Sequence, residues 1–219
     1  MTIEVSAFKW VPPFAVGFVR DLRVRWALEE AGLPYQARLI GLEEKSSDAY
    51  RAWQPFAQVP AYRDDEVEMF ESGAIVLHLM EKSEALAPRD PRGRANVMCW
   101  VVAALNSVEP FMNQFLACEG GRERGEAWAA ARRPQALETL EARLTSVGDR
   151  LGDREHLEGR FTAGDLMMTC VLRELVESGV LARFPNLDAL RARCEARPAF
   201  GRALEAQLAA FREHAPAAA

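Results

Sequence analysis

The patterning of this chain changes once, after residue 82, and that change limits its possible folds more than any other feature. Before it, strand-like and helix-like segments alternate, with strands predicted at residues 3–8, 35–40, 59–63 and 67–70 and helices at 14–31, 46–53 and 72–82. After it, every periodic segment is helical. This order predicts an α/β domain followed by an all-α domain.

A short stretch rich in helix breakers separates the two patterns. Residues 83–93 hold two prolines and a glycine, which is typical of an interdomain linker. The predicted domains are therefore 1–82 and 94–219. Within the second domain, helices are predicted at 94–109, 111–118, 128–151, 163–177, 187–195 and 198–211. Pro110 is predicted to kink the long helix in which it lies, and Gly120–Gly121 to form a loop.

Composition excludes several classes of partner. The 219 residues are 49% hydrophobic, which is enough for a sizeable core, and the net charge of −5 argues against nucleic acid as a partner. No apolar run approaches the ~18 residues of a membrane span. The N-terminus carries Glu4 and lacks the basic and apolar regions of a signal peptide, so a cytoplasmic protein is expected.

The cysteines and histidines predict neither a metal site nor a redox site. The four cysteines, Cys99, Cys118, Cys170 and Cys194, are irregularly spaced in helical patterns, no C-x-x-C occurs, and there are three histidines. We expect four reduced thiols in the core and no bound metal.

Two motifs at strand ends suggest a binding site. In Gln58-Val59-Pro60, a proline stands at a strand entrance, where it is either an ordinary trans residue or a cis residue that turns the Val59 backbone outward. In Glu71-Ser72, the serine is either a plain helix N-cap or, with the helix N-terminus, a site for a ligand carboxylate. Glu71 would then take a ligand ammonium, so an amino-acid head group suits the pair.

A third motif, Phe161-Thr162-Ala163-Gly164-Asp165-Leu166, predicts an N-capping box with a hydrophobic staple. Thr162 would cap the helix, and the Asp165 carboxylate would reach back to the Thr162 N–H. We assign this motif a structural role.

Together these motifs resemble the cytosolic glutathione S-transferase family, of bacterial type, over nearly the whole chain. The segments that carry the resemblance are LEEAGLPY at residues 28–35, QPFAQVPAY at 54–62, FESGAI at 70–75 and FTAGDL at 161–166. The resemblance implies a thioredoxin-like N-terminal domain, an all-helical C-terminal bundle, a homodimer and a cis proline at Pro60.

The resemblance also implies a glutathione site. Val59 would pair its backbone with the cysteinyl part of glutathione, and Gln58 would approach the glycine carboxylate. Pro60 shapes this edge, while Glu71 and Ser72 would hold the γ-glutamyl ammonium and carboxylate.

The chain departs from the family where the catalytic hydroxyl or thiol is expected. No Ser, Thr, Tyr or Cys occurs between Ser6 and Tyr35, and Pro12 stands at the usual position of the hydroxyl. The remaining candidates to stabilise a bound thiolate are the Trp10 indole, the backbone N–H of Phe14 and Arg20. Each also has a structural interpretation, such as lining a pocket or pairing with an acid.

An interdomain pocket for a second substrate is expected from residues that are aromatic or apolar, although they suit a protein core equally well. These are Trp10, Phe14, Phe111, Met112 and Phe115.

The leading hypothesis is an enzyme that conjugates glutathione, as cosubstrate, to a small hydrophobic electrophile. The alternative is a glutathione-binding carrier or interaction protein with little transferase activity. A cysteine-based reductase is disfavoured because no cysteine precedes Cys99.

Overall fold

Strand β1 (Ile3–Phe8) organises the first part of the chain. It pairs in parallel with β2 (Tyr35–Ile40) and antiparallel with β3 (Ala61–Arg63), which pairs antiparallel with β4 (Glu68–Phe70). The strand order of this mixed sheet is β2-β1-β3-β4. The predicted strands 3–8 and 35–40 are confirmed.

The computed structural model describes residues 2–216, which divide into two units. Unit 1 takes the chain up to Arg89 and again from Glu195 onward, and unit 2 takes Asp90–Cys194. Unit 1 combines the sheet with helices in the thioredoxin-like manner, and unit 2 is helical, as predicted. No helix of the described residues is both long and apolar enough to cross a membrane.

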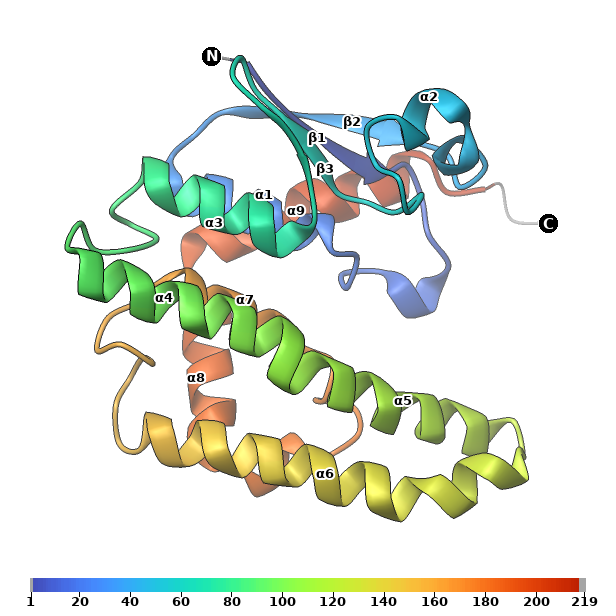
Figure 1. Cartoon of the computed structure of the whole chain (residues 1–219). Helices are drawn as coiled ribbons and strands as arrows, with labels where there is room; N and C mark the ends of the chain where they lie inside the picture. The colour runs from blue at the N-terminus through green and yellow to red at the C-terminus, as the bar shows by residue number, and fades with distance from the viewer. Residues whose placement is uncertain (1, 217–219) are drawn as a thin grey trace. The chain divides into compact units, whose positions relative to one another are not determined.

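The helices of unit 1 follow the sheet closely in sequence, with one exception. They are η1 (Pro13–Ala15), α1 (Asp21–Ala31), η2 (Glu44–Ser46), α2 (Asp48–Arg51), α3 (Ser72–Lys82) and α9 (Pro198–Glu213). Helices α1, α3 and α9 lie on one side of the sheet (Figure 1). Gly32 ends α1 in the left-handed conformation, at φ +65°, as its place after the helix predicts.

The exception is α9, which packs against α1 from the far end of the sequence. The Arg197 guanidinium donates to both Glu30 carboxylate oxygens, at 2.6 and 2.8 Å, and the Trp26 and Phe200 rings meet edge to face. The domain bounds 1–82 and 94–219 stay a prediction. Residues 1 and 217–219, which these ranges include, lie outside the described residues. The structure adds that α9 belongs with unit 1.

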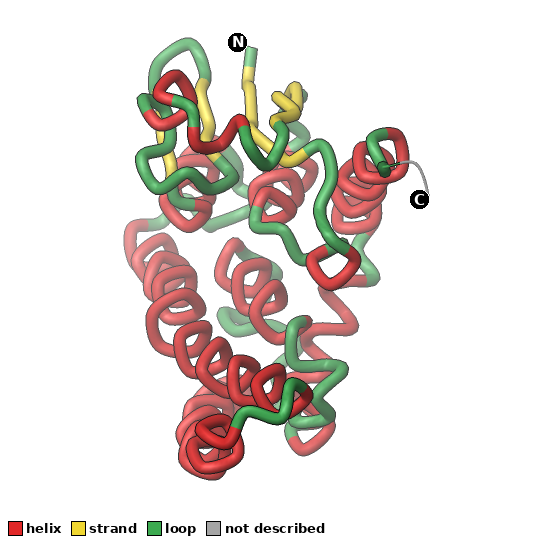
Figure 2. The backbone as a smooth tube through the Cα atoms, turned by 90° about the vertical axis from the view of Figure 1, so that its right-hand side faces the viewer, coloured by secondary structure: helices red, strands yellow, loops and turns green. Residues whose placement is uncertain are grey.

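Unit 2 is built from helices throughout (Figure 2). They are α4 (Pro91–Ala103), the π-helical segment η3 (Ala104–Val108), α5 (Glu109–Glu123), α6 (Ala127–Leu151), α7 (Ala163–Arg173), η4 (Leu181–Arg183) and α8 (Pro185–Glu195). Helix α7 packs against α4, and α6 packs against α5. The predicted capping box is confirmed, because the Thr162 N–H donates to Asp165 at 2.9 Å and Thr162 Oγ1 accepts from the Gly164 N–H.

Several predicted helix bounds are wrong. The helix predicted at 14–31 begins at Asp21, because Gly17 at φ +82° interrupts the chain after η1. Helix α4 begins at Pro91, inside the predicted linker, because the Asp90 carboxylate accepts a hydrogen bond from the Gly93 N–H at 2.8 Å. Proline suits the first helical position, where its missing N–H would have no partner. Pro110 follows the π-helical segment, which accounts for the predicted irregularity there.

Gly120 and Gly121 lie within α5 and not in a loop. A Cβ atom on Gly121 would stand 2.6 Å from the Ala129 Cβ of α6, so this glycine serves close packing of α5 on α6. The cysteine prediction is also wrong in part, because Cys99 is exposed while the other three are buried. None of the four, all within the described residues, forms a disulfide.

Candidate functional site

The strand register brings the predicted binding residues to one end of the sheet. Ala61 pairs with Phe70 across β3 and β4, so the next step of this antiparallel register sets Pro60 beside Glu71. Val5 pairs with Tyr62 across β1 and β3, so the end of β1 lies beside the same residues. The segment after β1, the Val59–Pro60 edge and the start of α3 therefore meet.

A chain of buried hydrogen bonds holds the Val59–Pro60 edge in place. The Ala61 N–H donates to Ser6 Oγ at 2.7 Å, Ser6 lies 2.7 Å from the Tyr50 hydroxyl, and that hydroxyl donates to the Gln58 carbonyl at 2.6 Å. Burial raises the pKa of Tyr50, so this phenol stays protonated and keeps donating. Ser6 is fully buried within this chain of bonds.

The backbone polar groups of Val59 stand at the cis peptide that begins this edge. The Val59–Pro60 peptide is cis, as the family resemblance implies. The Val59 side chain is buried in a cluster with Ile40, Tyr50 and Trp53. Within the described part of the chain, no hydrogen bond engages the Val59 N–H or C=O. The Gln58 N–H donates to Gln54 Oε1, and the Gln58 side chain is exposed beside this edge.

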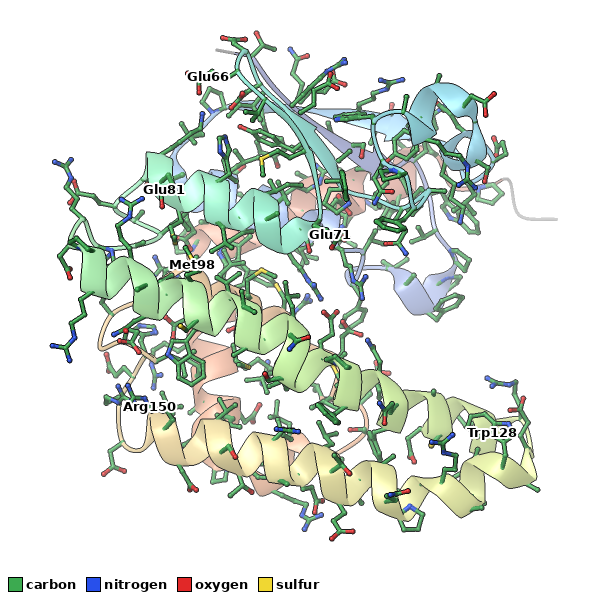
Figure 3. All side chains as sticks on the ribbon, in the orientation of Figure 1. Glu66, Glu71, Glu81, Met98, Trp128 and Arg150 are labelled. Atoms are coloured by element: carbon green, nitrogen blue, oxygen red, sulfur yellow. The ribbon has the colours of Figure 1, made fainter. Side chains whose placement is uncertain are left out.

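Glu71 and Ser72 stand at the start of α3, where Figure 3 shows Glu71 at the helix N-terminus. The interpretation of Ser72 as the N-cap is wrong, because Glu71 occupies that position and Ser72 is the first helical residue. Glu71 is exposed and takes φ +69°, a conformation that costs a non-glycine residue free energy. Among the residues that the structure describes, no side chain caps α3, so its first-turn N–H groups could bind an anion.

The segment between β1 and α1 carries the three candidates for thiol activation. Phe14 is 85% exposed, Trp10 is half-buried, and Arg20 is the exposed residue that precedes α1. The N–H groups of Ala15 and Val16 already donate to the carbonyls of Pro12 and Pro13, at 2.9 and 3.2 Å. Because Pro12 and Pro13 have no N–H, Phe14 has the one backbone N–H of residues 12–16 that these two hydrogen bonds do not use.

A buried polar cluster lies directly behind this segment. Asp21 is fully buried, and its Oδ2 accepts a hydrogen bond from Arg25 Nε at 2.6 Å. Its Oδ1 accepts one from Gln207 Nε2 of α9 at 2.7 Å. Burial raises the pKa of Asp21, and the Arg25 and Gln207 donors offset part of that rise.

The predicted pocket residues of unit 2 differ in exposure. Met112 and Phe115 are fully buried, whereas Phe111 is half-buried and lies under the Arg143 guanidinium, 4.4 Å from the ring centroid. Phe111 also lines a groove of about 370 Å³ between α5 and α6. The role of these three residues in a substrate pocket stays a prediction.

Sequence reasoning missed Tyr50, Gln54 and Gln207. Tyr50 and Gln54 support the Gln58 backbone from the preceding turn, and Gln207 supports Asp21 from the far end of the chain. No local pattern marks them, because their partners are backbone groups or residues distant in sequence.

Comparison with known proteins agrees with this fold. Residues 22–88 match the model of the glutathione S-transferase N-terminal domain. A glutathione S-transferase from Hyoscyamus muticus is 26% identical over 84% of this chain and 92% of its own length. A maleylpyruvate isomerase from a Ralstonia species is 29% identical over 84% of this chain and 91% of its own length.

A solved structure of a glutathione transferase family member from Pseudomonas fluorescens superposes with a TM-score of 0.79. It is 25% identical, covers 93% of this chain and 92% of its own, and was crystallised with two glutathione bound. A sheet with an open proline edge beside a helix N-terminus, followed by a helical unit, defines a thioredoxin-like transferase fold. Residues 22–88 thus carry a glutathione S-transferase N-terminal domain, and the chain is similar to glutathione transferases over most of its length.

Proposed function

We propose that this protein binds glutathione at the meeting point of β1, β3 and α3 and adds its thiolate to a small hydrophobic electrophile. The observation that carries the proposal is the convergence of the open Val59 backbone with Glu71 and Ser72 at one end of the sheet. One edge suits an extended peptide, and the other suits an amino-acid head group.

Each part of glutathione has a complementary partner in this arrangement. The Val59 N–H and C=O pair with the cysteinyl residue as a further strand would. The Ser72 hydroxyl and the first-turn N–H groups of α3 receive the γ-glutamyl carboxylate, and Glu71 receives the ammonium. The exposed Gln58 amide approaches the glycine carboxylate. The glutathione bound in the Pseudomonas fluorescens structure supports glutathione as the ligand.

Thiol activation falls to the segment after β1, because Ser6 is buried and no hydroxyl or thiol side chain occurs between Ser6 and Tyr35. A thiol with an ordinary pKa of ~8.5 is only a few per cent ionised at neutral pH. The Phe14 N–H, aided by the Trp10 indole or Arg20, is the donor set that would stabilise the thiolate. The exposed Phe14 ring favours a hydrophobic electrophile.

A second candidate is glutathione-dependent isomerisation, which the similarity to the Ralstonia maleylpyruvate isomerase favours. In an isomerisation of this kind, the thiolate would add to an activated alkene, the resulting single bond would rotate, and the thiolate would leave again. This reaction would use the same glutathione site as a transferase. Its stoichiometry differs, because glutathione is regenerated and not consumed. The missing hydroxyl favours a third outcome, a glutathione-binding protein with little activity.

Counting thiols separates these three outcomes. With an activated aryl chloride as substrate, a transferase consumes one glutathione per product. With maleylpyruvate, an isomerase forms product while the thiol concentration stays constant. A binder shows heat on titration with glutathione and neither reaction. If calorimetry detects no glutathione binding to the folded protein, the proposal is wrong. The homodimer and the cytoplasmic location stay predictions.

A further inference from the structure

We propose that Gln207 of α9 is a positioning residue for thiol activation, which rests on the proposed function. It fixes the turn that leads into α1, and through that turn it fixes the segment that carries Trp10, Phe14 and Arg20. A residue near the end of the chain would thus set the geometry of a site built from its beginning.

The contacts of Gln207 are specific to an amide donor. Its side chain is 1% exposed, and its Nε2 donates to the Val19 carbonyl at 3.2 Å and to Asp21 Oδ1 at 2.7 Å. Both partners are acceptors, so the amide nitrogen must face them. The Gln207 Oε1 is buried without a hydrogen bond within the described residues, so the side chain is held by its nitrogen alone.

Asp21 makes this contact costly to lose. Its carboxylate is fully buried and takes one side-chain donor on each oxygen, Arg25 from α1 and Gln207 from α9. When a buried carboxylate loses a hydrogen-bond donor, its free energy falls if it moves toward water. Removal of the amide would therefore shift the turn from Val19 to Asp21.

Two further contacts connect the same segment to its surroundings. The Val19 side chain packs against the cluster that contains Val59, so the turn sits beside the proposed cysteinyl edge. A Cβ atom on Gly17 would lie 3.6 Å from Leu204 of α9, so the loop passes close to this helix. Apart from the short η1, the segment has no regular structure of its own, and α9 acts as its support.

Hydrogen bonds to a thiolate depend steeply on distance and angle, so a small shift of this segment weakens thiol activation. The described contacts of Gln207 do not include Glu71 or Ser72. Binding of the γ-glutamyl group should then survive a substitution that disturbs the thiol. This separation distinguishes positioning from general support of the fold.

The experiment compares Gln207→Leu, which keeps the bulk and removes the donor, with Arg202→Ala. Arg202 is a matched control, because it also joins α9 to α1, through Glu29 at 2.7 Å, but on the exposed surface. Amide hydrogen exchange of residues 12–20 is measured without glutathione. Glutathione affinity, the pKa of the bound thiol from thiolate absorbance, and the pH profile of the reaction follow.

In Gln207→Leu, exchange in residues 14–19 should rise about tenfold, while glutathione affinity, measured at acidic pH where the bound thiol is protonated, stays within about twofold of wild type. The pKa of the bound thiol should rise by about one unit, so activity falls about tenfold at acidic pH and recovers at alkaline pH. Arg202→Ala should change none of these. If Gln207→Leu is poorly folded, Gln207→Asn, which withdraws the amide by one methylene, should show the same direction.

Wild-type exchange and an unchanged pH profile in both Gln207 variants would overturn the proposal. So would an equal loss of activity at every pH together with a lower melting temperature, since that result marks a purely structural role. A wild-type protein that binds no glutathione overturns the proposed function and the catalytic part of this inference with it. The exchange result then still decides whether Gln207 holds the segment.

Discussion

At the scale of single residues, Glu71 combines strain, exposure and position. Its φ of +69° and ψ of 113° lie where glycine is favoured, and yet a long acidic side chain stands there, at the open N-terminus of α3. Strain of this kind persists where the surrounding structure enforces it, often at ligand sites. This combination of strain and exposure supports the proposed role of Glu71 in ligand binding.

Glu71→Gly should separate these two roles. Because glycine adopts positive φ without steric cost, the free energy of unfolding should rise by about 1 kcal/mol. Glutathione affinity should fall by at least about tenfold, as expected for loss of a hydrogen bond to a charged group. Thermal unfolding and calorimetry measure the two effects.

Glu71→Ala is the control, since it removes the carboxylate and keeps the strain. It should weaken glutathione binding to the same extent without the gain in stability. A glycine variant that binds glutathione as tightly as wild type would remove Glu71 from the site.

At the scale of elements, close packing of α5 on α6 depends on Gly121, which has no Cβ atom. A Cβ at Gly121 would approach the Ala129 Cβ to 2.6 Å and the Trp128 ring to 3.1 Å, so one helix would have to move. At neighbouring Gly120, the nearest atom would be the flexible end of Arg124, at 3.3 Å. Two adjacent glycines in one helix thus have different reasons to be there.

Gly121→Ala should lower the free energy of unfolding by about 1–3 kcal/mol through overpacking. Gly120→Ala should leave it unchanged or raise it by up to about 1 kcal/mol, because alanine favours a helix interior. Urea unfolding of the two variants provides the comparison. If Gly121→Ala lowers the free energy of unfolding no more than Gly120→Ala does, α5 and α6 tolerate a wider separation.

At the scale of the whole molecule, a buried carboxylate in unit 1 links stability to pH. The Asp64 side chain is buried in the turn between β3 and β4, where it accepts hydrogen bonds from Lys82 Nζ at 2.9 Å and the Tyr62 hydroxyl at 2.8 Å. Burial by itself would raise the pKa of Asp64. The bonds from Lys82, the Glu66 and Val67 N–H groups and Tyr62 outweigh it and hold the pKa well below its usual range.

This lowered pKa predicts loss of stability in acid. The folded protein binds fewer protons at Asp64 than the unfolded chain, whose value is about 3.9, so the contribution is complete above about pH 5 and is lost as the pH falls below about 4. Asp64→Asn should lower the free energy of unfolding at pH 7 by about 2 kcal/mol. The difference in free energy of unfolding between wild type and Asp64→Asn should become smaller as the pH falls.

Melting temperatures across this pH range measure the difference, with Asp153→Asn as a control at an exposed carboxylate of unit 2. A deficit in Asp64→Asn that stays constant from pH 7 down to about pH 3 would show that the ionised carboxylate is not what stabilises the turn.

Features with local causes can be predicted from the amino-acid sequence alone. Strands β1 and β2, the bounds of α3, the Gly32 helix end and the Thr162–Asp165 capping box each follow from a few adjacent residues, whose propensities and side-chain hydrogen bonds act within one or two turns. The motifs at Val59 and at Glu71 were visible for the same reason.

Features that depend on contacts between distant residues are visible only in the folded protein. The helical state of Gly121 is set by its approach to α6, and the place of α9 in unit 1 is set by its packing on α1. Gln207 and Val19 are separated by 188 positions, so no periodicity or spacing could join them. Burial of the amide and its two acceptors creates that contact, because polar groups that leave water must find partners wherever the fold brings them.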